Sequence, residues 1–538
     1  MMVVKITPEK ALLAIKQVSP LVLRIVVPTV VLPLTLSTAF AADEQAPAQP
    51  ALLIQEAIFT QTAVPRQATT VELLTDSSEV NFAQSAVPTA RPTLEETEDA
   101  LQRQRQQKLA RSYDLPTLKS DAVLFSKYLN QALATGDMAT VKQLLPDYKA
   151  LANNDPTLIQ YAEALIYRSE GDNKAAIAIY RKMLATDPNF HPVRLNLATA
   201  LYVDKQYVAA KSQYLRLRAE PLPEPILASI ERSLQQLKRV DEWRFNTSIS
   251  YISDDNVNDV PGDYSVAPIK ANGLQATIGA KKRINLPKNY YATVGGNAFI
   301  KGYWDESDYN DYLFTVSTGA GYADAKNDIS LSPYMSKRYY NEADYSLSKG
   351  ISVRASRWVK PKLKLTLSSR YSNEKFEQKK DKNRETDGKF IGASGLYTKN
   401  ATEYYYGGVD HYRNEVPKSS IISYERNGVN VGWGKEWSRG ISTLTTVGYA
   451  IKDYDNPSET YRPGSGGYIG YYNSFGGEYG SNRKDKTTSL GLQVWKRDFT
   501  LYGLTPRVVM NYAKTSSNFR YYDNRDEKSA TVLLTKSF

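Results

Sequence analysis

The chain has 538 residues and a net charge of +11 at pH 7, and it contains no cysteine and two histidines. This composition excludes disulfides, Cys-ligated metals, cysteine nucleophiles and His-rich metal sites. Of the 39 tyrosines, 30 lie after position 242, as do all six tryptophans. The chain therefore divides into an N-terminal and a C-terminal part of different composition.

Catalytic motifs are missing from the sequence. There is no G-x-S-x-G, no H-E-x-x-H and no phosphate-binding loop. Paired carboxylates such as Asp254-Asp255 fall in predicted loops, where exposure to solvent explains them. We therefore predict that the protein is not an enzyme and has no catalytic, cofactor-binding or metal-binding residue.

The N-terminus has the three parts of a secretory signal peptide. Residues 1–24 are basic, 25–36 are apolar, and Ala39-Phe40-Ala41 is a small-x-small cleavage site. The alternative is a membrane anchor, but a spanning helix needs about 20 apolar residues. We expect a signal peptide over residues 1–41, and therefore export from the cytoplasm.

A polar extension and a helical repeat follow. Residues 42–118 are rich in Ala, Gln, Pro and Thr, a composition of low complexity that is mostly unable to fold alone. Over 119–240 the pattern is helical, and three pairs match at a spacing of 34: Ala164/Ala198, Ala176/Ala210 and Tyr180/Tyr214. This spacing predicts about three tetratricopeptide-like helical hairpins, with an unrelated helical bundle as the alternative.

Stacked hairpins form a concave groove that usually binds a peptide or protein segment. Tyr161, Arg168 and Tyr202 fall on the first helices of the predicted hairpins. They are our candidate residues for contact with a client protein, against the alternative that they are ordinary packing residues.

The C-terminal part, 241–538, alternates with a period of two. In 362–371, Leu363, Leu365 and Leu367 alternate with Lys364 and Thr366. Alternation of this kind, with Tyr and Trp near strand ends, is typical of a transmembrane β-barrel. Strands of ten or more residues without helical breaks argue against the alternatives, a soluble sandwich or propeller.

We count fourteen candidate strands, an even number, joined by alternately short and long connections. In outer-membrane barrels the short turns face the periplasm. The predicted fold is thus a periplasmic tetratricopeptide-like α-solenoid followed by a 14-stranded antiparallel β-barrel in the outer membrane of a Gram-negative bacterium. Trp243 and Phe538, on the first and last strands, are the predicted barrel seam.

The charge and the C-terminus suggest partners. Lipopolysaccharide is anionic, so basic residues at the barrel ends fit outer-membrane lipid, and no RNA-type motif points to nucleic acid. The terminal aromatic Phe538 resembles the signal read by the barrel assembly machinery, although Lys536 departs from the apolar residue usual there. Periplasmic chaperones are further expected partners.

A signal peptide, a short tetratricopeptide array and a fourteen-stranded barrel resemble the surface lipoprotein assembly modulators, the type XI secretion outer-membrane proteins. The local resemblance is carried by 253–258 after the first strand and by 503–507, 517–518, 521–522 and Phe538 at the end. The resemblance implies transport of client proteins, either surface lipoproteins or related soluble haem- and metal-acquisition proteins, across the outer membrane.

Two other functions stay open from the residues alone. A polysaccharide exporter also joins periplasmic tetratricopeptide repeats to a barrel, usually with a longer array. A diffusion porin would leave the helical domain unexplained. A fourteen-stranded barrel is too narrow for a folded domain, so we expect a client to pass unfolded or partly folded, or to use a laterally opened seam between the first and last strands.

Overall fold

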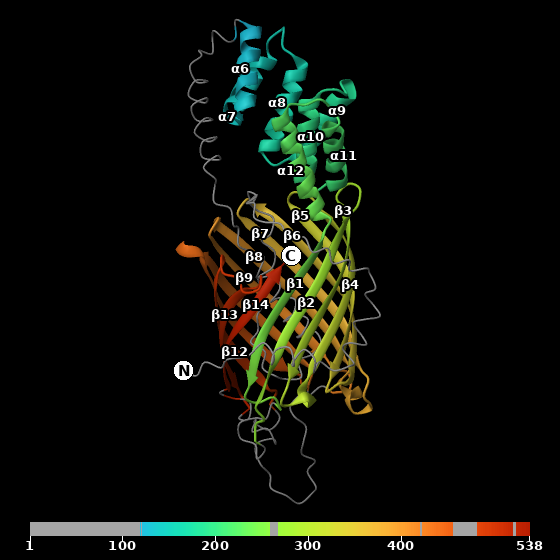
Figure 1. Cartoon of the computed structure of the whole chain (residues 1–538), viewed down its shortest axis with the longest axis vertical. Coiled ribbons are helices and arrows are strands. Elements are labelled where there is room, and N and C mark those ends of the chain that lie inside the picture. The colour runs from blue at the N-terminus through green and yellow to red at the C-terminus, as the bar shows by residue number, and fades with distance from the viewer. Residues whose placement is uncertain are drawn as a thin grey trace, which may run out of the picture.

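The computed structural model describes residues 119, 121–258, 267–419, 422–455, 481–519, 523 and 525–537. In this part of the chain a helical domain stands on one end of a β-barrel (Figure 1). The last helix ends at Val240 and the first strand begins at Trp243. The predicted signal peptide, the extension 42–118 and Phe538 lie outside the described residues.

The helical domain consists of three hairpins and a final helix. Its helices are α6 (Ala122–Thr135), α7 (Met138–Lys149), α8 (Pro156–Ser169), α9 (Asn173–Thr186), α10 (His191–Val203), α11 (Tyr207–Arg218) and α12 (Glu224–Val240). Local sequence sets their ends. The Asp121 carboxylate accepts the N–H groups of Val123 and Leu124 at the start of α6, and Gly136 closes that helix in the left-handed conformation.

The repeated small and aromatic residues form the core of this domain. Ala164 and Ala198 are fully buried, and the repeat tyrosines Tyr180 and Tyr214 lie in the same cluster. Small residues allow the helices to approach closely, while the tyrosines fill the space between hairpins. The tetratricopeptide-like arrangement predicted from the 34-residue spacing is therefore confirmed.

Fourteen antiparallel strands close into a barrel in which each strand pairs with its neighbours in sequence and β1 pairs with β14. The strands are β1 (Trp243–Asp254), β2 (Ala271–Asn285), β3 (Tyr290–Tyr303), β4 (Asp311–Ala323), β5 (Asn327–Tyr340), β6 (Ala343–Lys360), β7 (Leu363–Phe376), β8 (Thr386–Asn400), β9 (Glu403–Glu415), β10 (Tyr424–Glu436), β11 (Ile441–Tyr454), β12 (Lys484–Lys496), β13 (Thr505–Ser517) and β14 (Arg525–Ser537). The predicted strand number is confirmed.

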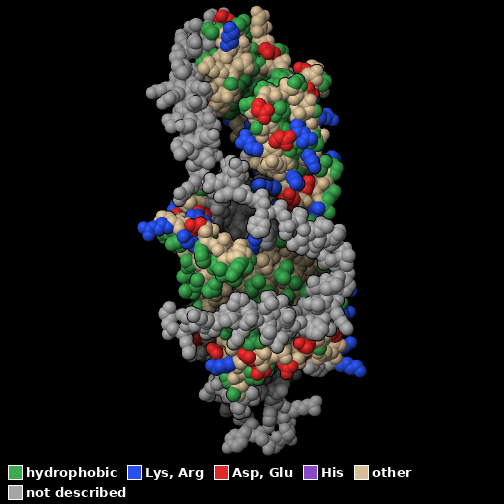
Figure 2. Space-filling model, in the orientation of Figure 1, with side chains coloured by type: hydrophobic (Ala, Val, Ile, Leu, Met, Phe, Trp, Pro, Cys, Tyr) green, Lys and Arg blue, Asp and Glu red, His purple; other side chains and the backbone are tan. Residues whose placement is uncertain are grey.

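The alternation along each strand separates an apolar outer wall from a polar lumen. On β7, Leu365 and Leu367 are exposed on the outside, while Lys364, which precedes them on the opposite face, is buried. Where the wall is visible in Figure 2, hydrophobic side chains cover its middle and charged side chains gather at its lower rim. This is the distribution a lipid-facing barrel requires.

No helix in the described ranges is both long and apolar enough to cross a membrane.

The connections differ between the two barrel ends. At the end next to the helical domain, most are short turns such as 286–289, 324–326 and 361–362, whereas the far end carries longer ones such as 377–385 and 416–423 (Figure 1). The helical domain therefore lies on the side of the short turns, as the alternation of connections predicts.

The junction of β1 and β14, which we call the seam, is the shortest strand pairing. Among the described residues its register runs from Asn246 opposite Ser537 to Ser250 opposite Leu533, which is five positions. On its other side β1 pairs with β2 over twelve positions. Beyond the five pairs, the Thr531 hydroxyl donates to the carbonyl oxygen of Tyr251 at 2.9 Å.

Candidate functional site

The helical domain meets the barrel through the turn between α10 and α11. Nδ2 of Asn289, in the β2–β3 turn, donates to the backbone oxygen of Asp204, and it lies 3.2 Å from Oδ2 of the same residue. It also donates to the carbonyl oxygen of Ala323 at 3.0 Å. Asp204 and Asn289 are both buried. Removing either partner would leave a buried polar group unsatisfied, which makes this contact costly to break.

A second contact joins α9 to the β4–β5 turn. Nζ of Lys174 donates to Oδ2 of Asp324 and to the hydroxyl of Tyr322, both at 2.9 Å. Burial works to raise the pKa of Asp324, but hydrogen bonds from Lys174 and from the backbone of Asn327 and Lys326 hold that pKa well below its usual value. The hydrogen bonds to Asp324 and Tyr322 raise the pKa of Lys174. The pair therefore stays charged around neutral pH.

A lysine occupies the third hairpin turn where the first two have glycine. Gly136 and Gly171 adopt left-handed backbone with φ of 71° and 78°, and Lys205 does so with φ of 60°. Left-handed backbone costs a residue with a Cβ about 1 kcal/mol or more. The third repeat therefore carries a conformational cost that the other two avoid, and the placement of the Lys205 side chain offers a reason.

The Lys205 ammonium lies at the barrel mouth beside Asp328 of β5. Its Nζ is 3.6 Å from Oδ2 of Asp328, and Oδ1 accepts a hydrogen bond from the Tyr291 hydroxyl at 2.6 Å. Nη1 of Arg283 is 3.9 Å from the same Oδ2, and its guanidinium lies 3.7 Å from the centroid of the Tyr291 ring. Burial lowers the pKa of Lys205, and the Asp328 charge opposes that effect.

A fourth contact lies where the chain crosses between the two parts. Nδ2 of Asn285, at the end of β2, donates to Oδ1 of Asp241 at 2.6 Å. The four contacts come from different turns and strand ends, all on the β2–β5 side of the mouth, below the helices (Figure 1). We refer to them together as the domain interface. They hold the helical domain against one end of the barrel.

The predicted contact residues Tyr161 and Arg168 share a polar network on the first helices. Asn196 of α10 donates to the Tyr161 hydroxyl at 2.8 Å and accepts a hydrogen bond from Arg168. The Tyr161 ring stacks on Phe190 with centroids 6.4 Å apart. Both predicted residues are half-buried. Asn196, which joins them, was missed because an isolated Asn on a helix gives no pattern.

Tyr202 is placed elsewhere, next to the third hairpin turn. Its ring meets Tyr207 edge to face at 5.6 Å between centroids, and it packs against the larger helical core. It too is half-buried. The structure therefore brings Tyr161 and Arg168 together and leaves Tyr202 apart from them.

Trp243 lies at the start of β1 but outside the seam register. It is opposite Lys282 of β2, and its ring stacks on Phe245 at 6.3 Å. Among the described residues, the register of β1 with β14 runs from Asn246 to Ser250. Phe538, its predicted partner, is outside the described residues.

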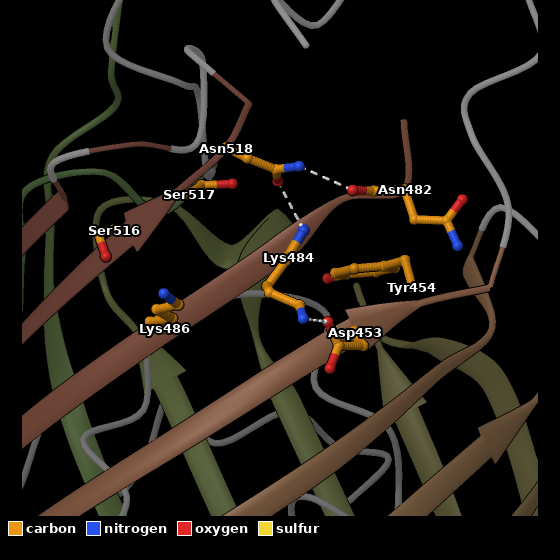
Figure 3. A pocket seen from close by; sticks show the side chains of 8 residues that line it. All are labelled: Asp453, Tyr454, Asn482, Lys484, Lys486, Ser516, Ser517 and Asn518. Carbon is orange, nitrogen blue, oxygen red and sulfur yellow. Dashed lines mark hydrogen bonds and ion pairs between the residues drawn. The ribbon is translucent and has the colours of Figure 1, made fainter. Parts of the chain in front are cut away.

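A polar depression of about 610 Å³ lies at the far end of the barrel, between β11, β12 and β13 (Figure 3). Nζ of Lys484 is 3.1 Å from Oδ1 of Asp453, and the Lys484 backbone N–H donates to Asn518 at 2.7 Å. These bonds tie the strand ends together. Within the described ranges, no group of three or more His, Asp or Glu side chains is placed to hold a metal ion.

Comparison with known proteins gives matches over both parts of the chain. Residues 243–538 match the model of the family described as surface lipoprotein assembly modifier, and residues 111–214 match the N-terminal repeats of that family. The barrel match alone spans more than half of the chain.

Curated relatives agree with this match. The chain is 29% identical to a surface lipoprotein assembly modifier of Pasteurella multocida, covering 79% of this chain and 85% of the relative. It is 32% identical to one from Moraxella catarrhalis, covering 73% and 76%. It is 22% identical to a hemophilin secretion modulator of Acinetobacter baumannii, covering 73% and 82%. With its helical repeats fixed over the mouth of a closed, lipid-facing barrel, the chain belongs to the surface lipoprotein assembly modifier family of the outer membrane.

Proposed function

We propose that this protein moves specific client proteins, either surface lipoproteins or related soluble haem- and metal-acquisition proteins, from the periplasm to the cell surface or medium. The names of the relatives support a protein client: most are lipoprotein assembly modifiers, and one is a secretion modulator for hemophilin. This support favours a protein client over the polysaccharide and porin alternatives.

The domain interface is the observation that carries the proposal. Buried or charge-assisted contacts of Asn289, Lys174 and Lys205 hold the helical domain over the entrance of a membrane channel. Stacked helical hairpins of this kind usually bind a peptide or protein segment. Helices α6 and α7 extend away from the barrel, so part of the solenoid stands clear of the membrane (Figure 1). A client captured there is already close to the mouth, which raises its effective concentration at the entrance.

Tyr161 and Arg168, with Asn196, are the proposed client-contacting residues on the solenoid, and Tyr202 is a weaker candidate nearer the barrel. Half-buried polar side chains on the first helices keep one side accessible while their partners hold them in place. Arg and Tyr in such positions are the residue types that dominate protein interfaces. The barrel assembly machinery and periplasmic chaperones remain proposed partners.

Surface display of a client in a laboratory host tests the proposal. Client and translocator are co-expressed, and the client is detected with antibody on intact cells and in the medium. We expect display to require this protein, with client trapped in the periplasm when the gene is omitted. Equal display without it would overturn the proposal, and loss of exopolysaccharide with unchanged protein secretion would support the exporter instead.

A single substitution tests the solenoid face in the same assay. Arg168→Gln breaks the bond to Asn196 and removes a charge from the face, so we expect display to fall about fivefold. Lys182→Gln, an exposed residue of the second helix of the hairpin, is the matched control. Equal display by the two variants would remove Arg168 from the proposed client contacts.

A further inference from the structure

Basic side chains gather inside the barrel at the end next to the helical domain. Strand alternation directs Arg244, Lys281 and Arg283 of β1 and β2 into the lumen, together with Arg354 of β6 and Lys364 of β7. Electrostatic interactions link them in a chain: Lys281 with Arg244 and Arg283, and Lys364 with Arg354 and with Lys205 of the helical domain. We call these six residues the luminal basic cluster.

Two members of the cluster are placed directly against each other. Arg244 is opposite Lys281 in the β1–β2 register, on the same face of the wall. Like charges directly opposite on neighbouring strands destabilise a sheet. A barrel selected only for stability would replace one of them, and an anion between them would remove the repulsion.

Carboxylates do not balance this cluster among the described residues. Asp328 is the carboxylate that Lys205, Lys281 and Lys364 share. On the opposite wall at the same level, Glu436 is already ion-paired with Arg497. Leaving Arg354 aside, the other five cations therefore lie around Asp328 and Asp324, and Asp324 also pairs with Lys174.

The far half of the lumen is built differently. There Lys301 lies 3.6 Å from Asp254, Arg338 makes a 2.7 Å ion pair with Asp311, and Arg426 pairs with Asp410. Each of these three basic residues has a carboxylate partner on another strand. They differ in this from the luminal basic cluster at the end next to the helical domain.

The cluster is open to solvent despite its depth in the molecule. Arg244 and Lys281 are exposed, Arg283, Arg354 and Lys205 are half-buried, and Lys364 alone of the six is buried. The barrel wall around them has a low dielectric constant, and such walls focus the field of a charged cleft on what enters it. An anionic ligand arriving from the helical domain meets this field first.

We propose that the luminal basic cluster binds a carboxylate-rich segment of the client polypeptide as that segment enters the barrel. This inference rests on the proposed function, because the helical domain over the mouth is what identifies the anion as part of a protein. A lipid headgroup is disfavoured because the cluster faces the lumen and not the lipid. Charge attraction holds the segment at the entrance without a tight pocket, so the segment can move on.

Binding of a fluorescent glutamate-rich peptide to the purified full chain in detergent tests the inference. The test variant is Lys281→Gln with Lys364→Gln. The matched control is Lys301→Gln with Lys452→Gln, which removes two luminal lysines from the far half. We expect peptide affinity to fall by about tenfold in the test variant and to change little in the control. Raising the salt concentration should weaken wild-type binding, and a lysine-rich peptide should not bind.

Heat-modifiable migration on gels checks that both variants form a barrel. Equal affinities in the two double variants, or no binding by the wild-type chain, would overturn the inference. The client display assay decides the proposed function independently. If display needs this protein but the peptide does not distinguish the variants, only the luminal inference is wrong.

Discussion

At the domain interface, buried Asn289 and Asp204 and the Lys174–Asp324 ion pair tie the helices to the barrel, whereas at the seam β1 and β14 meet over five register positions. The first junction joins two separately folded parts and the second closes a single barrel. One would therefore expect the seam, which closes the barrel, to be the more extensively bonded of the two junctions. The reverse arrangement indicates that the helical domain keeps its position over the mouth and that the seam is the less supported part of the wall.

Breaking the domain interface should have the largest effect. In the double variant Asn289→Ala with Asp324→Ala, buried Asp204 loses its hydrogen-bond donor and Lys174 loses its carboxylate partner. Leaving the buried group unsatisfied alone should cost about 1–3 kcal/mol of stability. We expect client display on intact cells to fall by about tenfold or more. The barrel itself should still migrate as a heat-modifiable band.

The matched control for that variant is Lys362→Ala with Asn400→Ala. Lys362 lies in the β6–β7 turn and Asn400 ends β8, both at the same end of the barrel, and neither belongs to the domain interface. Display by the control should match the wild type. A loss of display in both variants would mean that the turns matter for assembly and not for holding the helices.

Crosslinking the seam should have the next largest effect, on stability. The chain has no cysteine, so Ser250→Cys with Leu533→Cys places a single pair at the last seam register position. A disulfide typically contributes about 2–4 kcal/mol, so the oxidised barrel should need a higher temperature than the reduced one to unfold in SDS. The control pair, Ser250→Cys with Gln275→Cys, crosslinks the well-paired β1–β2 junction and should gain less.

The same crosslink separates the two routes for the client. Because the luminal basic cluster lies inside the wall, we expect display to persist when the seam is locked. Display that stops under oxidising conditions and returns on reduction would instead assign the route to the seam.

Replacing Lys205 by glycine should separate stability from function. Lys205→Gly relieves the left-handed backbone, so the helical domain should gain about 1 kcal/mol in unfolding free energy. The loss of the Asp328 contact should nevertheless reduce client display. Chemical denaturation monitored by helical circular dichroism, alongside the display assay, would show the two changes in opposite directions. Reduced stability would show that Lys205 is needed for the turn itself.

The smallest effect concerns pH. The pKa of Asp324 is lowered in the fold, so its contribution is present above its unfolded value of about 3.9 and is lost as the pH falls through the folded value. The pKa of Lys174 is raised, so its contribution is present below about 10.4 and is lost at higher pH. The ion pair should therefore keep its full strength between about pH 5 and 9.

Thermal unfolding of the wild type and of Asp324→Asn measures this contribution. The difference between their midpoints should be constant between pH 5 and 9 and should shrink in strong acid. Because Lys174 is largely exposed, salt should reduce the difference. A midpoint difference that grows as the pH falls would contradict the assignment of an ion pair between Lys174 and Asp324.

The sequence predicts this fold well where a residue pattern repeats along the chain. The spacing of Ala164 and Ala198 and the alternation around Leu365 each follow from one regular structure, so helical hairpins and strands could be inferred. The contact of Asn289 with Asp204 could not be inferred in this way, because it depends on how two parts of the chain are placed. Nothing local marks such a residue.

The seam and the luminal cluster show the same limit. Trp243 was expected at the seam because it begins the first strand, and the described part of the seam register lies three residues further along, from Asn246. Alternation already placed Lys281 and Lys364 on the polar faces of their strands. Only the closed barrel and the docked α10–α11 turn show that both lie near Asp328.

Removing residues 119–240 while keeping the predicted signal peptide, residues 1–41, and the barrel tests the central claim most directly. Client on intact cells would be counted by antibody labelling, with total client and heat-modifiable barrel measured in the same cultures. We predict a normally assembled barrel, unchanged total client and display reduced to the level of cells without the gene. Display equal to that of the full chain would contradict the claim that the docked helical domain delivers the client.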